Sequence, residues 1–328
     1  MHRRDVLHAA VALGVGIAAS GLAHAQSYPM RPITLVVPYA AGGPTDTVAR
    51  ILAEGMRRSL GQPVIVENVA GASGTIGVGR VARAAPDGYT FVLGNIATHV
   101  LNGPLFTLPY DLQRDFQPVS LVSNESLVII AKKTIPANDL AEFVAWLKAN
   151  PDKATQGTSG AGGITTVGGL LFQRETGTRF RSVPYRGGQA PALQDLLGGQ
   201  IDFMIATSAS ALAHIRAGTI KAYAVTSTSR LAAASDIPTV GEAGLSGLYV
   251  LNWQATFLPK ATPKDIVARL NAAVVVALAD PGVRRRLADI GQAIFPREQQ
   301  TPEALAAFQG AEVEKWWPII KAANIKGE

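Results

Sequence analysis

A repeated order of buried strand, glycine-containing loop and amphipathic helix limits the folds open to this chain more than any other feature. The apolar segment 33–38 leads through Gly42 and Gly43 into a helical pattern that begins near Thr45. Further units of this kind follow at a spacing of roughly 30 residues, the length of a strand–helix–strand unit. Parallel strands need crossover helices, so the pattern predicts an α/β fold whose sheets are mixed and mostly parallel.

The spacing of apolar residues locates the individual elements. Strands are expected where short apolar runs lie between turn residues, and helices where apolar residues recur at i, i+3, i+4 and i+7. The predicted strands are 33–38, 64–66, 89–93, 127–131, 181–184, 203–206, 222–226 and 251–258. The predicted helices are 75–85, 138–150, 190–197, 208–217, 263–279 and 302–323, with two more after the loops that end at Gly43 and Gly163. Thr45 or Asp46 is expected to cap the first helix.

Residues 1–25 are predicted to be an export signal rather than part of the fold. Arg3 and Arg4 precede a run rich in alanine, valine and glycine, and Ala23-His24-Ala25 has the small-x-small pattern of a cleavage site. The apolar run is shorter and richer in glycine and alanine than a membrane span. The paired arginines fit a twin-arginine signal, and the general secretory route fits equally well. We therefore expect a periplasmic protein that begins near Gln26 after cleavage.

The composition excludes several kinds of site. The 328 residues include no cysteine, which excludes disulfides and thiolate metal ligands. Of the five histidines only His99 and His214 lie beyond the signal, so neither a metal centre nor a cofactor is expected. The formal net charge is +6, but lysine and arginine are scattered along the chain, so a nucleic-acid partner is not expected either.

Two glycine loops are the main candidates for a functional site. Gly42-Gly43 and the run 160–163 each stand before a predicted helix. Backbone N–H groups at a helix start lack intrahelical partners and the helix dipole adds positive potential, so such a loop can bind a phosphate or carboxylate. For one loop alone, a tight strand–helix turn explains the glycines better. One loop in each half of the chain favours a ligand held between two domains.

The sequence lacks the arrangements typical of an enzyme. It has no P-loop, and Thr165 stands where a dinucleotide-binding motif containing Gly160 and Gly162 needs its third small residue. A G-x-S-x-G nucleophile motif is also missing from the sequence. His99 and His214 are interpreted as hydrogen-bonded bystanders, so no catalytic residue is assigned.

Several motifs, taken in order, resemble one family. The matching segments are VPYAAGGPTD at 37–46, VEN at 66–68, GASG at 71–74, DGYT at 87–90, VPYRG at 183–187, PAL at 191–193, DLLGG at 195–199, PTV at 238–240, EAG at 242–244 and TP at 262–263. With them the chain resembles the Bug (TctC-like) family, which are extracytoplasmic solute-binding receptors of tripartite tricarboxylate transporters. The resemblance covers the signal and nearly all of the remaining chain.

The resemblance implies a two-lobed periplasmic binding protein of the Venus-flytrap type. One lobe would contain residues 27–125 and 245–328, and the other residues 126–244. Such a receptor is a monomer without enzymatic activity. It captures a small organic carboxylate, here a di- or tricarboxylate or an aromatic acid, and delivers it to the membrane permease subunits of its transporter.

The same resemblance implies which residues bind the ligand. Backbone amides of the loops 39–46 and 158–166 would hold the carboxylate, together with water. The expected site residues are Tyr39, Ala41, Gly42, Gly43, Thr45, Asp46, Ser73, Asn95, Thr158, Ser159, Gly160, Ala161, Gly162, Gly163, Thr166, Ala206 and Thr207.

Three positions depart from the pattern that is common in the family. Thr166 stands where many relatives have a histidine, Leu170 lies near an acidic position, and Ala206 replaces a residue that is often polar or acidic. An ammonium group needs a carboxylate partner in the cleft, so we expect a simple diacid to bind better than a free amino acid unless Asp46 supplies that partner. Two other functions stay open, namely a secreted α/β hydrolase or lyase acting on small acids and a periplasmic module that presents a ligand to a sensor.

Overall fold

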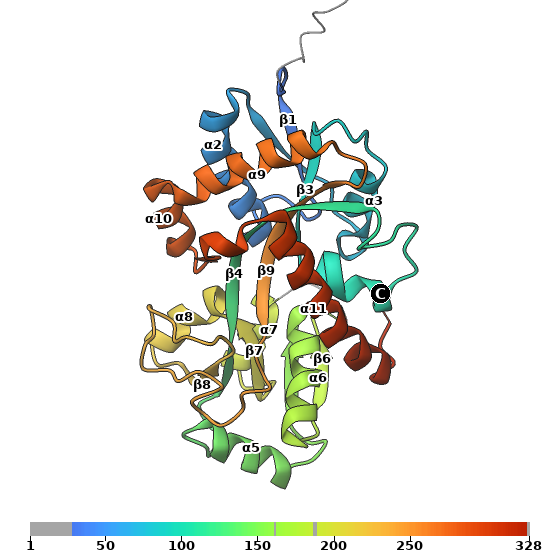
Figure 1. The fold of residues 1–328 in the computed structure, drawn as a ribbon. Helices are drawn as coiled ribbons and strands as arrows, with labels where there is room; N and C mark the ends of the chain where they lie inside the picture. Colours follow the sequence, from blue (N-terminus) through green and yellow to red (C-terminus); the bar gives the residue numbers. More distant parts are fainter. Residues whose placement is uncertain (1–27, 161, 186–188, 327–328) are drawn as a thin grey trace, which may run out of the picture.

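Residues 28–160, 162–185 and 189–326 are described by the computed structural model of the protein (Figure 1). The predicted export signal and Ala161 of the second glycine loop lie outside these ranges. Within them the chain folds into two lobes, each built on a β-sheet with helices packed against it (Figure 1). The predicted α/β class with mixed sheets is confirmed. The sheets are not mostly parallel as predicted, because the strands at 116–132 and 251–259 pair antiparallel with all their neighbours.

The sheet of the first lobe combines parallel and antiparallel pairs. Its strands are β1 (Ile33–Val37), β2 (Val64–Asn68), β3 (Thr90–Asn95), the first part of β4 (Phe116–Lys132), β9 (Leu251–Pro259) and β10 (Ala293–Ile294). β1 pairs in parallel with β2 and β3, whereas β9 runs antiparallel to both β3 and β4. The short β10 pairs antiparallel with β4.

The sheet of the second lobe repeats this mixture. Its strands are the last part of β4, β5 (Thr155–Thr158), β6 (Arg181–Pro184), β7 (Phe203–Thr207) and β8 (Ile220–Val225). β5 pairs in parallel with β6 and β7, and β4 runs antiparallel to β7 and β8.

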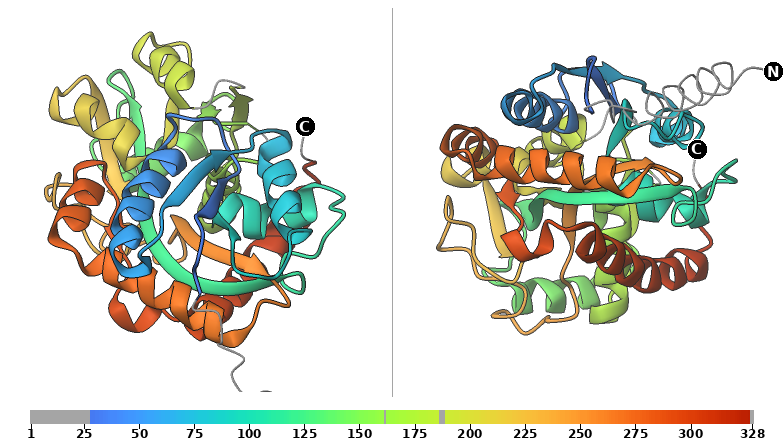
Figure 2. Two further views of the ribbon diagram at one scale, coloured as in Figure 1. Left: turned by 90° about the horizontal axis from the view of Figure 1, so that it is seen from above. Right: turned by 45° about the horizontal axis from the view of Figure 1, so that its top comes forward.

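Helices cover both faces of the sheets. The helices are α2 (Pro44–Leu60), α3 (Thr75–Ala82), α4 (Asn102–Leu105), α5 (Leu140–Ala149), α6 (Ile164–Thr176), α7 (Gln189–Leu197), α8 (Ser208–Arg216), α9 (Lys264–Ala279), α10 (Pro281–Asp289) and α11 (Pro302–Ala322), with short helical segments η1 (Ala72–Gly74), η2 (Ala97–Leu101) and η3 (Arg297–Gln299). The right-hand view of Figure 2 shows β4 (green) between α9 (orange) and α11 (dark red), and both helices contact this strand.

The long strand β4 belongs to both sheets. Its residues 116–126 pair with β9 in the first lobe, and residues 127–131 pair with β7 in the second. The sequence analysis predicted only 127–131, because Pro118 and the polar residues that follow it interrupt the apolar pattern. In the structure these polar side chains find hydrogen-bond partners, as Ser123 does by donating to Gln292 at 2.8 Å. The strand therefore continues without a break from one lobe into the other.

Strand directions place two sets of strand ends opposite each other. β3 and β4 are both antiparallel to β9, so β1, β2 and β3 run along β4 toward the second lobe. β7 is antiparallel to β4, so β5, β6 and β7 run toward the first lobe. The carboxyl ends of both sets of parallel strands therefore face one another across the junction. Ligands of open α/β sheets bind beyond such carboxyl ends, and α2, α6 and α8 all begin there.

The other predicted elements agree with the structure, but several elements were missed. α4, α10, β5, β10 and the three short helical segments were not predicted, and the boundaries of the predicted elements differ by only a few residues. Across the residues that the structure describes, no single helix has the length and apolar character needed to cross a membrane. α9 and α10 meet that requirement only as a pair, and the pair is bent by 72°.

Candidate functional site

The first glycine loop joins β1 to α2 at the facing edge of the first lobe. Gly42 has φ +83°, a left-handed conformation that glycine adopts without strain. Gly43 is the N-cap of α2 and Pro44 follows it, so no side chain caps this helix. The predicted cap at Thr45 or Asp46 is therefore wrong, because both residues already lie inside the first turn.

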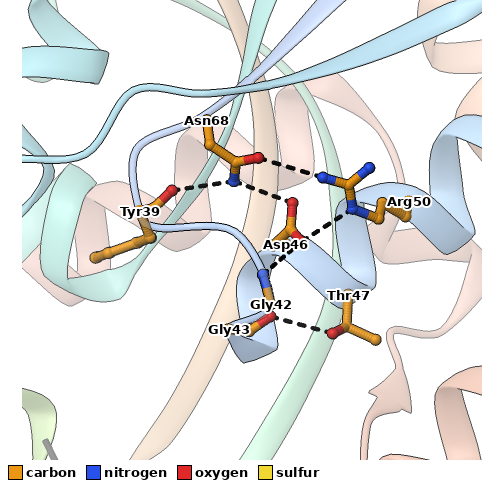
Figure 3. Close-up of polar contacts among 7 residues, drawn as sticks. All are labelled: Tyr39, Gly42, Gly43, Asp46, Thr47, Arg50 and Asn68. Carbon is orange, nitrogen blue, oxygen red and sulfur yellow. Dashed lines mark hydrogen bonds and ion pairs between the residues drawn. The ribbon is translucent and has the colours of Figure 1, made fainter.

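Asp46 holds the loop from inside the helix (Figure 3). Its carboxylate accepts hydrogen bonds from the Gly42 N–H at 2.8 Å, from Nε of Arg50 at 2.9 Å and from Nδ2 of Asn68 at 3.0 Å. Asn68 also donates to the Tyr39 carbonyl at 3.0 Å, which ties the beginning of the loop to β2. The side chains of Asp46 and Asn68 thus fix the loop at both ends.

The Asp46 carboxylate is buried and ionised within this network. Its side chain is only 3% exposed, while that of Arg50 is 54% exposed. Burial works to raise the pKa of Asp46, but hydrogen bonds from Arg50, the Gly42 N–H and Asn68 outweigh it and hold the pKa below its ordinary value. Asp46 is therefore an ionised residue that positions the loop. Its carboxylate is buried and already accepts three hydrogen bonds, so it is not exposed to a ligand ammonium group.

Hydroxyl groups hold the second glycine loop, which joins β5 to α6. The side-chain oxygen of Thr165 accepts a hydrogen bond from the Ser159 N–H at 2.8 Å and lies 2.9 Å from the Ser159 hydroxyl. Thr166 donates its hydroxyl hydrogen to the Gly160 carbonyl at 2.6 Å, and the Gly163 N–H donates to the same carbonyl at 3.1 Å. Thr165 is completely buried, and no sequence pattern indicates that its hydroxyl holds this loop.

Both helices that follow these loops begin without a side-chain cap. Gly43 before α2 and Gly163 before α6 have no side chain to accept the first N–H groups. Pro44 has no N–H group, and the N–H groups of Gly163 and Thr166 already donate to carbonyls of the second loop. The N–H groups of Thr45 and Asp46 in α2, and of Ile164 and Thr165 in α6, lack an intrahelical acceptor, and the helix dipole places positive potential on them. Each helix start can therefore bind one carboxylate.

The second loop reaches across to the first lobe. A Cβ atom placed on Gly162 would lie 3.1 Å from Cδ1 of Leu105 at the end of α4, and 3.9 Å from the ring of Phe106. The φ angle of Gly162 lies outside the left-handed range, so its lack of a side chain serves this close approach rather than a turn. A side chain here would require the Leu105 side chain to shift by a few tenths of an ångström.

A strained segment lies at the carboxyl end of β2. Ala72 and Ser73 have φ angles of 44° and 52°, values that non-glycine residues rarely adopt. Nδ2 of Asn102 donates a hydrogen bond to the Ser73 carbonyl at 3.0 Å. The Ser73 residue itself is exposed. Strain of this kind persists where the surrounding structure imposes it and gathers at functional sites.

Asn95 and Tyr39 meet beneath the first loop. The Tyr39 hydroxyl donates to Oδ1 of Asn95 at 3.1 Å, and the Thr98 N–H donates to the same oxygen at 3.1 Å. Burial raises the pKa of Tyr39 to about 12, so its hydroxyl is protonated at neutral pH. This contact links the carboxyl ends of β1 and β3.

The remaining predicted residues differ in how they lie. Ala41 is exposed at the first loop. Ala206 is completely buried in an apolar cluster and pairs with Val128, so it lies behind the facing edge rather than on it. Thr158 is 1% exposed, and its hydroxyl has no hydrogen-bond partner among the described residues. The N–H of Thr207, the N-cap of α8, donates to Oε1 of Gln189 at 2.8 Å.

Neither histidine is placed to act as a base. His99 is completely buried and stacks on Phe257 with 3.9 Å between ring centroids, and burial lowers its pKa to about 3. His214 lies near the end of α8 beside Thr219. In the part of the chain that the structure describes, no group of three or more metal-ligating side chains comes together.

The fold and the facing loops together define a class of protein. Two lobes are joined by β4, which runs from one into the other, and each lobe presents an uncapped helix start at the edge facing its partner. This is the architecture of a two-lobed solute-binding protein.

Comparison with known proteins identifies the family. Residues 48–325 match the Tripartite tricarboxylate transporter family receptor, TctC. The chain is 33% identical to the protein BugT of Bordetella pertussis over 319 residues, which are 96% of this chain and 97% of BugT. The chain therefore belongs to the Bug/TctC family of periplasmic solute-binding receptors, and the predicted family is confirmed.

Solved structures agree with this assignment. MatC from Rhodopseudomonas palustris, solved with bound malate, has a TM-score of 0.77 and 40% identity, covering 89% of this chain and all of its own. A second R. palustris protein, solved with adipate, has a TM-score of 0.77 and 31% identity, covering 91% of this chain and 99% of its own.

Proposed function

We propose that this protein is a periplasmic receptor that captures a small organic acid between its lobes and delivers it to the permease subunits of a tripartite tricarboxylate transporter. The observation that carries this proposal is the pair of uncapped helix starts, at α2 and α6, on facing edges of the two lobes. Each supplies N–H groups for one carboxylate. The structural relatives solved with malate and with adipate, both dicarboxylates, support this ligand class.

The proposal also includes the boundaries of the two lobes and the compartment in which the protein works. One lobe consists of residues 27–125 with 245–328 and the other of residues 126–244. In support, β4 exchanges its pairing partner from β9 to β7 between Ser126 and Leu127. The protein works as a monomer in the periplasm after cleavage near Ala25, and it binds its ligand without converting it.

A free amino acid is not the preferred ligand. Its ammonium group would need an acceptor that carries negative charge. Two carboxylates lie near the facing loops, and both are already engaged. Asp46 accepts from Gly42, Arg50 and Asn68, and the buried Glu125 accepts from Ala209 and Gln292. A simple diacid needs no such acceptor.

A thermal-shift screen of the mature protein tests this proposal. The panel contains mono-, di- and tricarboxylates, aromatic acids, amino acids and sugars, each at millimolar concentration. We expect a diacid to give the largest rise in Tm, since a ligand at 100 times its Kd stabilises by about 2.7 kcal/mol. The proposal fails if sugars or amino acids raise Tm more than any carboxylate does.

Two further measurements address the alternatives. Nuclear magnetic resonance of the bound acid after a day with the protein should show no conversion, whereas a hydrolase or lyase would produce new signals. Cells that lack this receptor should take up the acid more slowly. Unchanged uptake together with an altered transcriptional response would favour the sensory role instead.

A further inference from the structure

A buried glutamate lies where β4 passes from one lobe into the other. Glu125 is 2% exposed and is paired with Asn252 in the β4–β9 ladder, one residue before the last pair of that ladder. It therefore stands at the level where the carboxyl ends of the two sets of parallel strands face each other. The proposed function makes no use of it.

The carboxylate of Glu125 accepts a hydrogen bond from the first turn of α8. Its Oε1 accepts the backbone N–H of Ala209, the second residue of α8, at 2.9 Å. Its Oε2 accepts Nε2 of Gln292 at 3.5 Å, and the side chains of Thr207 and Asn252 also donate to it. Both oxygens are thus engaged by donors, which is the arrangement a carboxylate requires.

This contact joins the two lobes as well. Glu125 and Gln292 belong to strands and loops packed with the first sheet, while Ala209 belongs to the second lobe. The turn before Gln292 packs closely on α8, because a Cβ atom on Gly291 would lie 3.5 Å from Cβ of Ala209. The turn at Gly291 therefore packs against one side of the start of α8.

The three helix starts at the junction are thus used differently. α2 and α6 follow glycine N-caps, whereas α8 follows Thr207 and receives the carboxylate of Glu125. The side chains and N–H group that face this carboxylate, from Thr207, Ala209, Asn252 and Gln292, are all neutral. Burial raises the pKa of Glu125, and these hydrogen bonds work against that rise. A ligand carboxylate that approached α8 would meet an N–H group that is already occupied and, with Glu125 ionised, a like charge.

We propose that Glu125 is a specificity-determining residue that limits the ligand to two carboxylates by occupying the start of α8. This inference rests on the proposed function and refines it, since it selects dicarboxylates over tricarboxylates. Like charges that come together at a binding site cost several kcal/mol, and a repulsive group of this kind is a common source of selectivity.

Three matched acids isolate the effect of a third carboxylate. Tricarballylate is glutarate with a carboxylate on its central carbon, and 3-methylglutarate carries a methyl group at the same position. The ratio of the Kd for tricarballylate to the Kd for 3-methylglutarate therefore reports the cost of the charge at nearly constant shape. We expect this ratio to be at least about tenfold in the wild-type protein, which corresponds to about 1.4 kcal/mol.

Two variants should move this ratio in opposite directions. Glu125→Gln keeps an oxygen for the Ala209 N–H but removes the charge, so the ratio should fall by at least about tenfold, measured by calorimetry at pH 7.5. Thr207→Asp adds a carboxylate at the N-cap of α8, a position that favours Asp, so the ratio should rise. It also keeps the inference testable if Glu125→Gln fails to fold.

Glu142→Gln is the matched control. Glu142 accepts the backbone N–H of Asn138 at 2.7 Å near the start of α5, at the far end of the second lobe (Figure 1). This variant removes the same charge from a similar contact, and it should leave the ratio unchanged.

The outcomes separate this inference from the proposed function. An equal ratio in the wild type and in folded Glu125→Gln overturns the role of Glu125, and so does an equal ratio in Thr207→Asp where only that variant folds. A wild-type protein that binds none of the three probes also overturns it. The proposed function is overturned only when the full carboxylate panel fails.

Discussion

The two glycine loops reach the same result by different chemistry. In the first, an ionised carboxylate inside α2 holds the backbone, with Asn68 and Arg50 as its partners. In the second, the hydroxyl groups of Thr165 and Thr166 do so without any charge. Each ends in a helix start that no side chain caps. The conformation of the first loop should therefore depend on the protonation state of Asp46. The conformation of the second loop should not depend on pH in this way.

The largest effect is expected from Gly162→Asp in the second loop. The new side chain would meet Leu105 of the first lobe and place a negative charge beside the start of α6. Hydrogen bonds to charged groups are worth about 1.5–3 kcal/mol each, so the affinity for the best diacid should fall by about a hundredfold. Calorimetry measures this loss.

Gly198→Asp is the matched control for that variant. Gly198 is exposed, lies just after α7, and has room for a Cβ beside its own helix backbone. Its affinity should equal that of the wild type. If Gly162→Asp is folded and binds as tightly as the control, the second loop does not hold the ligand.

Removing the carboxylate of the first loop should cost stability. Asp46→Ala removes the charged acceptor of the Gly42 N–H and of one N–H of Asn68, and hydrogen bonds to charged groups are worth about 1.5–3 kcal/mol. The free energy of unfolding in urea should fall by about 2 kcal/mol. Asp46→Asn keeps one acceptor oxygen and should lose less. Equal losses in both variants would show that the charge of Asp46 is irrelevant.

The corresponding change in the second loop should be smaller. Thr165→Val keeps the shape of the side chain but removes the acceptor of the Ser159 N–H. The expected loss is about 1 kcal/mol, because the contact is between neutral groups and Ser159 is only half-buried. Urea unfolding should show this loss, and a loss larger than that of Asp46→Ala would reverse the comparison of the two loops.

The smallest expected difference between the two loops is in how their contributions to stability change at acid pH. The folded pKa of Asp46 lies below its unfolded value of about 3.9, so its stabilisation is complete above that pH and disappears as the pH falls through the folded pKa. The difference in unfolding free energy between wild type and Asp46→Asn should therefore narrow below about pH 4. The difference for Thr165→Val should stay constant. Parallel pH profiles for the two variants would contradict this account.

Much of the fold could be predicted from local patterns in the sequence. Short apolar runs followed by glycine and an amphipathic helix located most strands and helices, because these patterns reflect burial on one face. β4 could not be read in this way. Its first part carries Ser120, Ser123 and Glu125 inside the molecule, and their partners, such as Gln292, lie far along the chain. Because these polar groups are hydrogen-bonded by residues far along the chain, the local sequence does not show that they can be buried in a strand.

The two candidate loops could be predicted from the sequence, but the contacts that hold them could not. Glycine before a helix indicated both loops, and the structure places them on facing edges. The roles of individual side chains depended on contacts that the sequence does not reveal. Asp46 was expected as a helix cap and instead accepts the Gly42 N–H from inside α2, and no role in holding the second loop was expected for the Thr165 hydroxyl. Ala206 lies within the core because the register of β7 turns it away from the junction.

Amide resonances of the two loops test the central claim most directly. The protein labelled with nitrogen-15 is titrated with the best diacid from the thermal-shift panel, and backbone shifts are followed to saturation. We predict that the amides of Gly43 and Thr45 in the first loop and of Gly162 and Ile164 in the second shift together, with one acid bound per chain. Shifts confined to one loop, or largest outside both, would contradict a ligand held between the two helix starts.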